Sequence, residues 1–170
     1  MEPLGLQYIA GAIAGTANVR IYDMRVDSLP LDRVLAEFRP DLIGIRENYT
    51  VDVEAVKDVA RQIKHLAPGV PIVVGGHHVS LCPSDAFTPD IDAIVIGDGE
   101  WTFRHLVESL QRYGRLDKTV NVIFQDAQGQ FDSSHVYAQK KTSLKEFDSP
   151  SMDERPTPSR NLVDLYRPDY

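Results

Sequence analysis

The hydrophobic positions of this chain alternate between helical spacing and short β-branched runs. The strongest amphipathic pattern covers residues 51–66, where Val53, Val56, Ala60 and Ile63 recur on one face. Helical spacing also occurs at residues 1–15, 31–38 and 101–113. The pattern therefore predicts four helices, and Gly114 is suited to end the last of them.

Short apolar runs separate these helices and predict four strands, at residues 18–24, 41–45, 71–75 and 92–96. Apolar runs of this kind are typical of parallel strands that are covered on both faces. Because strands and helices alternate, we expect an α/β fold with a doubly wound parallel sheet and helices on both sides.

The pattern changes after residue 118. Residues 120–124 and 131–136 are apolar runs separated by polar turn residues, which predicts a β-hairpin. Residues 140–170 carry scattered charges and four prolines, at Pro150, Pro156, Pro158 and Pro168. Their composition predicts an extended linker rather than a packed element.

Two of the predicted strands end in glycines. One strand runs into Gly75 and Gly76, and the other into Gly97 and Gly99. Glycine lacks a Cβ atom and tolerates positive φ, so such loops let a ligand approach the backbone closely. Ligands bind beyond the carboxyl ends of strands in open α/β sheets, so we expect both loops to line one pocket. The alternative is that each glycine pair only makes a tight turn.

Composition narrows the class of protein. With 170 residues, 42% hydrophobic and 25% charged, the chain has the make-up of one globular domain. A net charge of -7 argues against a nucleic-acid partner. The sequence has no apolar run of membrane length and no signal peptide, and we expect a cytoplasmic protein. The one cysteine, Cys82, fits a reducing compartment; alone it forms neither a disulfide nor a zinc site, and we interpret it as incidental.

Polar side chains near the predicted strand ends are further candidates for ligand contacts. The loop at residues 46–52 offers amide and hydroxyl groups from Asn48, Tyr49 and Thr50. Arg46 in the same loop either meets a phosphate or pairs with Glu47 or Asp52.

Asp98 and Glu100 form a carboxylate pair beside the second glycine loop. No nucleophile or metal partner lies near them in the sequence, so acid–base catalysis is not indicated. We interpret Glu100 as a favourable charge at the start of the next helix. Trp101 packs either on a ligand or on another domain.

Two other ligand-binding classes with similar folds fit less well. A phosphoacceptor receiver domain needs an aspartate at the end of a central strand and a lysine at the end of a later one. Here the corresponding pairs are Ile45-Arg46 and Ile96-Gly97. A nicotinamide or flavin domain is not indicated either, because no G-x-G-x-x-G motif opens the first helix.

Five motifs, in their order and spacing, closely resemble the cobalamin-binding amino-terminal domain of cobalamin-dependent radical S-adenosylmethionine enzymes. They are PLGL at residues 3–6, YD at 22–23, PDLIGI at 40–45, VGGHH at 74–78 and IGDGE at 96–100. The resemblance implies a flavodoxin-like, Rossmann-like domain over residues 1–140, with cobalamin over the carboxyl edge of its sheet. Residues 141–170, with RNL at 160–162 and YR at 166–167, are similar to the linker toward the radical domain.

The resemblance, taken with residue types, implies a set of cofactor contacts. A corrinoid needs small residues, backbone amides and a cleft for its nucleotide tail. The expected cofactor-binding residues are Asn48, Tyr49, Thr50, Gly75, Gly76, His78, Gly97, Asp98, Gly99 and Glu100. His78 corresponds to the family histidine, and it either orients its loop, hydrogen-bonds the cofactor or ligates cobalt. No histidine stands in a D-x-H-x-x-G motif, so a histidine-ligated corrinoid is not indicated.

Two departures from the family limit the expected activity. A radical domain needs three cysteines in a C-x-x-x-C-x-x-C motif, and this chain has one. We therefore expect S-adenosylmethionine and the 4Fe-4S cluster only in an absent downstream domain. Family members also start with an apolar strand that lies in the middle of the sheet. This first strand is missing here. The chain was cut, its start was assigned too late, or the sheet tolerates the loss of the strand.

The resulting functional hypothesis is a cobalamin-binding domain of a radical enzyme that methylates an unreactive carbon or performs a related ring-forming oxidation. Substrates among the relatives include polycyclic terpenoid lipids and tetrapyrroles, and the sequence does not choose between them. The alternative is a free-standing corrinoid carrier or sensor without catalytic activity. A three-cysteine motif beyond Tyr170 would distinguish the enzyme from the carrier.

Overall fold

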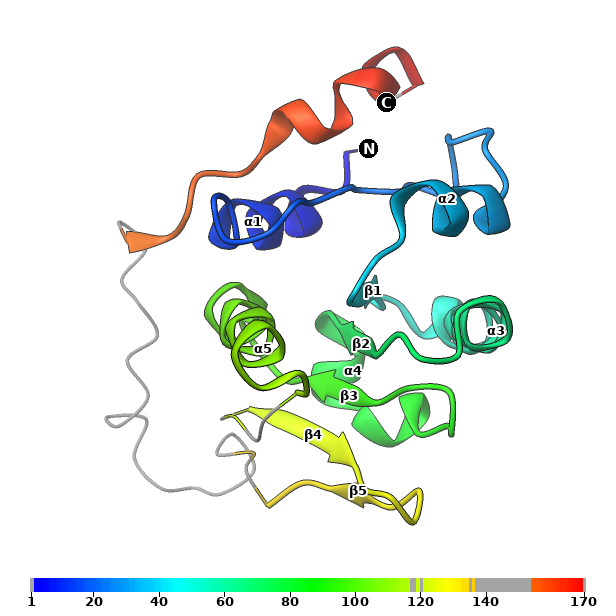
Figure 1. Cartoon of the computed structure of the whole chain (residues 1–170), viewed down its shortest axis with the longest axis vertical. Helices are drawn as coiled ribbons and strands as arrows, with labels where there is room; N and C mark the ends of the chain where they lie inside the picture. Colours follow the sequence, from blue (N-terminus) through cyan, green and yellow to red (C-terminus); the bar gives the residue numbers. More distant parts are fainter. Residues whose placement is uncertain (1, 117–118, 120, 135, 137–153, 170) are drawn as a thin grey trace.

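One five-stranded sheet forms the centre of the molecule (Figure 1). The computed structural model describes residues 2–116, 119, 121–134, 136 and 154–169. In spatial order the strands are β1 (Ile43–Arg46), β2 (Ile72–Gly75), β3 (Ala93–Val95), β4 (Val122–Gln125) and β5 (Phe131–Asp132). β1, β2 and β3 are parallel, whereas β4 and β5 are added antiparallel. The predicted α/β class, with its parallel strands and hairpin, is confirmed, and the sheet as a whole is mixed.

Helices cover both faces of the sheet, as the sequence predicts (Figure 1). The longer ones are α3 (Val53–Leu66) on one face and α5 (Gly99–Tyr113) on the other. Successive strand residues point to opposite faces, so Val74 packs on the side of α3 and Val73 on the side of α5. Three short elements also lie at the ends of the strands, namely η1 (Thr50–Asp52), α4 (His77–Leu81) and η2 (Pro83–Ala86).

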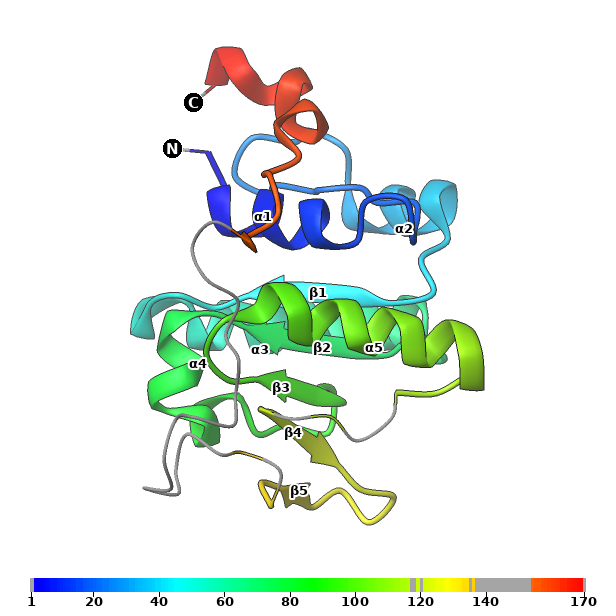
Figure 2. The ribbon, with the colours of Figure 1, turned by 90° about the vertical axis from the view of Figure 1, so that its left-hand side faces the viewer.

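A separate layer lies beyond the free edge of β1 (Figures 1 and 2). It contains α1 (Leu4–Ala12), α2 (Leu31–Phe38) and the 3-10 helix η5 (Arg160–Asp169). Val163 and Tyr166 of η5 are buried against Ala10 and Ile21, and the Ser159 amide donates to the Gln7 carbonyl over 2.9 Å. The prediction of an unpacked linker is therefore wrong for residues 160–169, while residues 140–153 lie outside the described part.

The predicted strand at residues 18–24 is wrong, because none of these residues joins the sheet. Val19 and Ile21 instead pack in the same apolar cluster as α1 and η5, which accounts for their apolar character. Among the described residues no strand lies between this segment and β1, so its backbone has no partner for a ladder.

The remaining differences concern short elements. α4 lies where the sequence predicts no helix, because five residues are too few to show a helical period. α5 begins at Gly99, two residues before the expected start at residue 101. No helix in the described segments combines the length and the apolar character that crossing a membrane requires.

Candidate functional site

The first glycine loop follows β2 and is packed tightly against the backbone after β1. Gly76 has φ 139° and ψ -177°, and a Cβ atom there would lie 2.3 Å from the Glu47 carbonyl oxygen. The backbone amide of His77 donates to Asn48 Oδ1 over 3.2 Å. The glycine at 76 is therefore required by contacts within the protein itself.

The second glycine loop follows β3 and is open. Gly97 has φ 77°, and among the described residues, its two chain neighbours aside, no atom lies within 4 Å of the position that its Cβ would take. Gly99 starts α5 and lies close to α1, because its Cβ position is 2.9 Å from Ile9 Cδ1. Gly97 thus leaves space over its backbone that the described part of the chain does not fill.

Ser80 of α4 joins the two loops. Its hydroxyl donates to the Gly76 carbonyl oxygen over 2.7 Å and accepts from the Gly97 amide over 2.9 Å. The two loops therefore lie side by side, as the ends of the neighbouring parallel strands β2 and β3 predict. The sequence analysis missed Ser80 because it did not predict α4.

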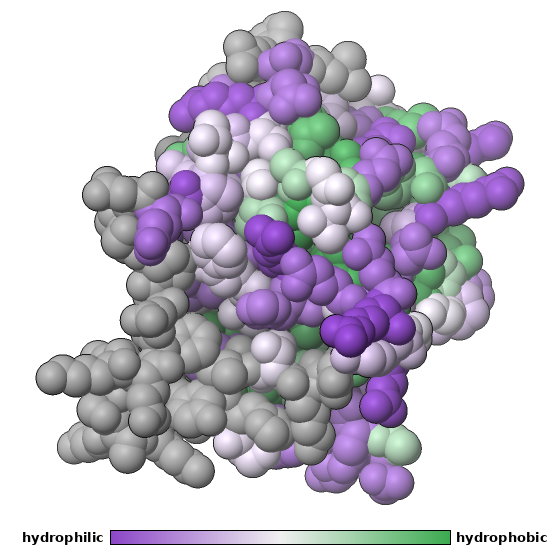
Figure 3. All heavy atoms as spheres, turned by 60° about the vertical axis from the view of Figure 1, so that its left-hand side comes forward, coloured by the Kyte–Doolittle hydropathy of each residue, from purple (hydrophilic) through white to green (hydrophobic). Residues whose placement is uncertain are grey.

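One large cavity, of about 1740 Å³, runs from both loops along the free edge of β1. Its walls are largely aliphatic and come from α1, α5 and β1. On one side of the molecule, apolar residues reach the surface among hydrophilic ones (Figure 3). Seven predicted site residues line the cavity, namely Asn48, Gly75, Gly76, Gly97, Asp98, Gly99 and Glu100. The structure therefore brings most of the predicted set to one space.

The other three predicted site residues, Tyr49, Thr50 and His78, do not line this cavity. Tyr49 is 59% exposed at the surface. His78 is buried in α4, with Nδ1 3.3 Å from Thr50 Oγ1 and Nε2 3.0 Å from Asp85 Oδ2. His78 thus ties three short elements together behind the first glycine loop.

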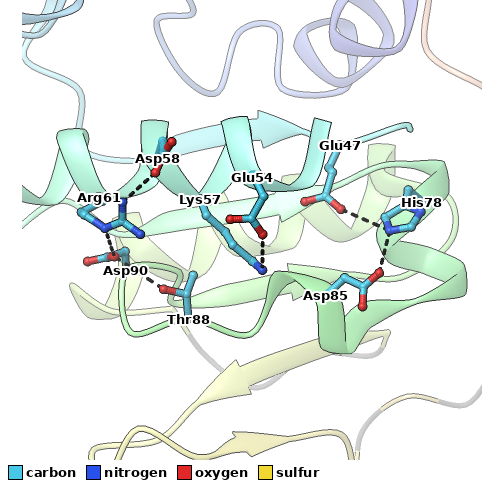
Figure 4. Close-up of polar contacts among 9 residues, drawn as sticks. All are labelled: Glu47, Glu54, Lys57, Asp58, Arg61, His78, Asp85, Thr88 and Asp90. Atoms are coloured by element: carbon cyan, nitrogen blue, oxygen red, sulfur yellow. Dashed lines mark hydrogen bonds and ion pairs between the residues drawn. The ribbon is translucent and has the colours of Figure 1, made fainter. Parts of the chain in front are cut away.

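Glu47 is a buried carboxylate that the sequence analysis did not single out. Its side chain is fully buried, neither carboxylate oxygen has a hydrogen-bond partner, and Oε1 lies 3.9 Å from His78 Nε2 (Figure 4). Burial raises the pKa of Glu47 above its usual value, although the nearby His78 opposes this rise. Of the alternatives for Arg46, the pairing with Glu47 is wrong, because the Glu47 carboxylate accepts no hydrogen bond. Arg46 lines the cavity.

Asp98 and Glu100 hold a cation from the far end of the chain. Arg155 Nη2 lies 2.7 Å from Asp98 Oδ2, and Nη1 lies 3.3 Å from Glu100 Oε1. Glu100 also stands in the first turn of α5, where a negative charge is favourable to the helix dipole. The sequence analysis missed Arg155, since a contact across 57 residues leaves no periodic pattern.

The sequence is similar to known methyltransferases. The model of the family described as B12 binding domain matches residues 1–107. An uncharacterized methyltransferase of Pyrococcus horikoshii is 29% identical over 174 residues, covering 98% of this chain and 36% of that protein. The hopanoid C-3 methylase of Methylococcus capsulatus is 31% identical over 134 residues, covering 76% of this chain and 26% of that protein. The chain thus spans only about a third of the first relative and a quarter of the second.

Solved structures share the fold. The radical S-adenosylmethionine methyltransferase TsrM of Kitasatospora setae, with cobalamin and a [4Fe-4S] cluster bound, aligns with a TM-score of 0.63 at 23% identity. That alignment covers 76% of this chain and 25% of TsrM. OxsB, a cobalamin-dependent S-adenosylmethionine radical enzyme, gives 0.63 at 24% identity, over 77% of this chain and 19% of OxsB. With the family match over more than half of its length, the chain belongs to the B12-binding domain family.

Proposed function

We propose that this chain holds cobalamin where its two glycine loops meet, and that the corrinoid serves methyl transfer in a larger radical S-adenosylmethionine enzyme. The observation that carries the proposal is the open backbone of Gly97, joined through Ser80 to the first loop and facing the large cavity. A flat macrocycle needs this combination of bare backbone and adjoining space.

The residues of the cavity fit the chemistry of a corrinoid. Its apolar rim matches the aliphatic walls from α1, α5 and β1, and its amide fringe matches the exposed backbone of the loops. Asn48 lines the same cavity, and the carboxylates of Asp98 and Glu100 stand at its border. When bound, the corrinoid supplies a cobalt–carbon bond from which a methyl group can be transferred.

The predicted contacts divide into two roles in this proposal. Gly97 lets the cofactor approach the backbone, and Gly75, Gly76 and Gly99 border the same cavity. Asn48, Asp98 and Glu100 offer polar groups to the amides of the cofactor. Thr50 and His78 act from behind, because their contact over 3.3 Å holds α4 under the first loop. Tyr49 is exposed beside them and is available to the cofactor tail.

Methylation by the whole protein is a proposal that rests on its relatives. The relatives with similar sequences are methyltransferases, and this chain has one cysteine where a radical cluster needs three. We therefore assign the 4Fe-4S cluster and S-adenosylmethionine to a separate downstream domain, with residues 141–170 leading toward it. The single cysteine also favours a cytoplasmic, reducing location.

Cobalamin retention by matched glycine variants tests the proposed site. The purified chain is mixed with hydroxocobalamin, passed through a desalting column and measured by visible absorbance. We expect about one cobalamin per chain, and about a tenfold loss of affinity in Gly97→Leu because the side chain fills the approach to the backbone.

Gly129→Leu is the control for this experiment. Gly129 also has φ 77° and no protein atom within 4 Å of its Cβ position, but it lies in the turn between β4 and β5. The backbone strain is therefore the same in both variants. Equal retention by the two variants, or no retention by the folded wild-type chain, would overturn the proposed site.

A further inference from the structure

Behind the first glycine loop, three side chains of different chemistry converge. His78 and Cys82 come from α4 and the residue after it, and Asp85 comes from η2. One ligand atom of each lies within 4.8 Å of the others, and His78 Nε2 is 3.0 Å from Asp85 Oδ2. None of the three lines the large cavity, so the cluster is separate from the proposed corrinoid site.

The imidazole of His78 is already oriented for use of its second nitrogen. Without an ion, Nε2 can donate to Asp85 Oδ2 over 3.0 Å. With an ion bound, Nδ1 would carry the proton and donate it to Thr50 Oγ1, 3.3 Å away, which frees the lone pair of Nε2 for the metal. Metal-bound histidines typically use one ring nitrogen as a ligand while the other donates to a neighbouring oxygen. The arrangement around His78 has this form.

Glu47 provides an independent observation. Its carboxylate is fully buried, has no hydrogen-bond partner, and points at His78 from the end of β1, 3.9 Å from Nε2 (Figure 4). A buried carboxylate without a partner is costly, and such groups are usually paired or bound to a metal. Asp85 adds a second carboxylate to the same imidazole nitrogen, so the cluster has an excess of acceptors.

We propose that His78, Cys82 and Asp85 bind a divalent transition-metal ion of the Zn²⁺ type, with the buried carboxylate of Glu47 beside His78. Zn²⁺ binds nitrogen, thiolate and carboxylate ligands at about 2.0–2.3 Å, which places the ligand atoms of a tetrahedral site about 3.5 Å apart. His78 Nε2 and Asp85 Oδ2 are 3.0 Å apart, and all three ligand atoms lie within 4.8 Å of one another, so the observed separations lie around that value.

The mixed donor set determines the class of ion. Thiolate and imidazole ligands favour Zn²⁺ over Mg²⁺ or Ca²⁺, which are bound mainly by oxygen atoms. Binding releases the thiol proton of Cys82, because the thiolate is the ligand. The ion would fix α4 to η2, next to the first glycine loop.

Metal titration of the metal-free chain, without cobalamin, tests the site. Zn²⁺ binding is measured by equilibrium dialysis with elemental analysis, and Co²⁺ is used as a spectroscopic probe. We expect one ion per chain and a thiolate-to-cobalt charge-transfer band, which has one source because Cys82 is the single thiol of the sequence.

Variants separate the ligands from their surroundings. Cys82→Ser should abolish the charge-transfer band, and it should fold because Cys82 is exposed. His78→Gln and Glu47→Gln should each weaken Zn²⁺ binding by about tenfold or more. His105→Gln is the matched control, since His105 is an exposed histidine of α5 that faces Glu108 instead.

The Zn²⁺ stoichiometry and the Co²⁺ spectrum can also overturn the proposal. If the folded wild-type chain binds less than stoichiometric Zn²⁺, or if Co²⁺ gives no thiolate band, the site does not exist. In that case the hydrogen bond between His78 and Asp85 accounts for the cluster. Retention of Zn²⁺ affinity by His78→Gln would equally exclude these ligands.

Discussion

The two glycine loops look alike in the sequence but differ in what their glycines do. In the first loop Gly76 is forced by the protein, because the Glu47 carbonyl oxygen and Asn48 Oδ1 lie 2.3 and 2.7 Å from its Cβ position. In the second loop Gly97 meets nothing within 4 Å. Gly76 thus serves packing and Gly97 is open to a ligand, although the two glycines follow neighbouring strands.

The comparison shows how one loop can position the other. The first loop is tied to the end of β1 through the contact of His77 with Asn48. Through Ser80 it then holds the amide of Gly97 in place. A rigid loop next to an open one keeps the ligand-facing backbone ordered without filling the space above it.

The largest expected effect is on the first loop. Gly76→Ala should lower the free energy of unfolding by about 3 kcal/mol or more, because φ 139° with ψ -177° is essentially restricted to glycine and the new Cβ collides with backbone. Gly97→Ala should cost only about 1 kcal/mol, the strain of a positive φ. Urea unfolding followed by circular dichroism measures both, and equal values would contradict the distinction between the loops.

A smaller effect is expected from the link between the loops. Ser80→Ala removes two hydrogen bonds, each worth about 1 kcal/mol at most, so stability should fall by about 1.5 kcal/mol. Cobalamin retention should fall as well, because the Gly97 amide loses its partner. Ser109→Ala is the control, since its hydroxyl also donates to a backbone carbonyl, that of Arg115, at the far end of α5.

Ser80→Ala with unchanged retention of cobalamin would mean that the loops do not depend on each other. A loss of stability as large as that of Gly76→Ala would instead mean that the second loop is packed as tightly as the first. The Ser109→Ala chain shows how much a serine hydroxyl outside the two loops contributes to the stability of this protein.

The adjacency of the loops could be predicted from the sequence, but their difference could not. Parallel strands place their carboxyl ends together, so the apolar runs before Gly75 and Gly97 are sufficient to bring the two turns side by side. The collision at Gly76 depends on the path of the backbone at Glu47, which comes from a different strand. No local pattern records such a contact.

Contacts between distant segments also explain why Ser80, Arg155 and Glu47 were not predicted and why the strand predicted at residues 18–24 is wrong. Ser80 lies in a helix of five residues, and Arg155 reaches Asp98 from the far end of the chain. Glu47 reads as a polar loop residue, but it is fully buried, and His78 of α4 lies 3.9 Å from its carboxylate. The segment at residues 18–24 has the apolar pattern of a strand, but Ile21 is buried by η5 instead of by a neighbouring strand.

The smallest expected effect concerns the carboxyl-terminal segment, which contacts the second loop through Arg155. Tyr166 donates a hydrogen bond to the Asp27 carboxylate and anchors η5 to the layer of α1. Burial alone would raise the pKa of Asp27, but the hydrogen bonds from Tyr166 and the Leu29 amide, with the charge of Arg20, leave it below the usual value. Burial and the bond to Asp27 raise the pKa of Tyr166 to about 12.

The directions of the pKa shifts of Asp27 and Tyr166 determine the pH range in which their hydrogen bond stabilises η5. Because the pKa of Asp27 is lower in the folded state, its contribution is present above about pH 4 and is lost as the pH falls further. The pKa of Tyr166 is raised, so its contribution is present below about pH 10 and is lost as the pH rises toward 12. The anchor is therefore strongest across the neutral range.

Amide hydrogen exchange of residues 160–164, corrected for intrinsic exchange rates, measures this anchor at about pH 6 and about pH 3. We expect protection to fall at the lower pH in the wild-type chain, and to fall less in Tyr166→Phe, where the hydroxyl that binds Asp27 is absent. Residues 60–64 of α3 serve as the internal reference, because they pack in the sheet core away from η5. If wild-type and Tyr166→Phe chains lose protection equally, the Asp27 contact does not hold the segment, and Arg155 reaches the second loop by apolar packing of η5 alone.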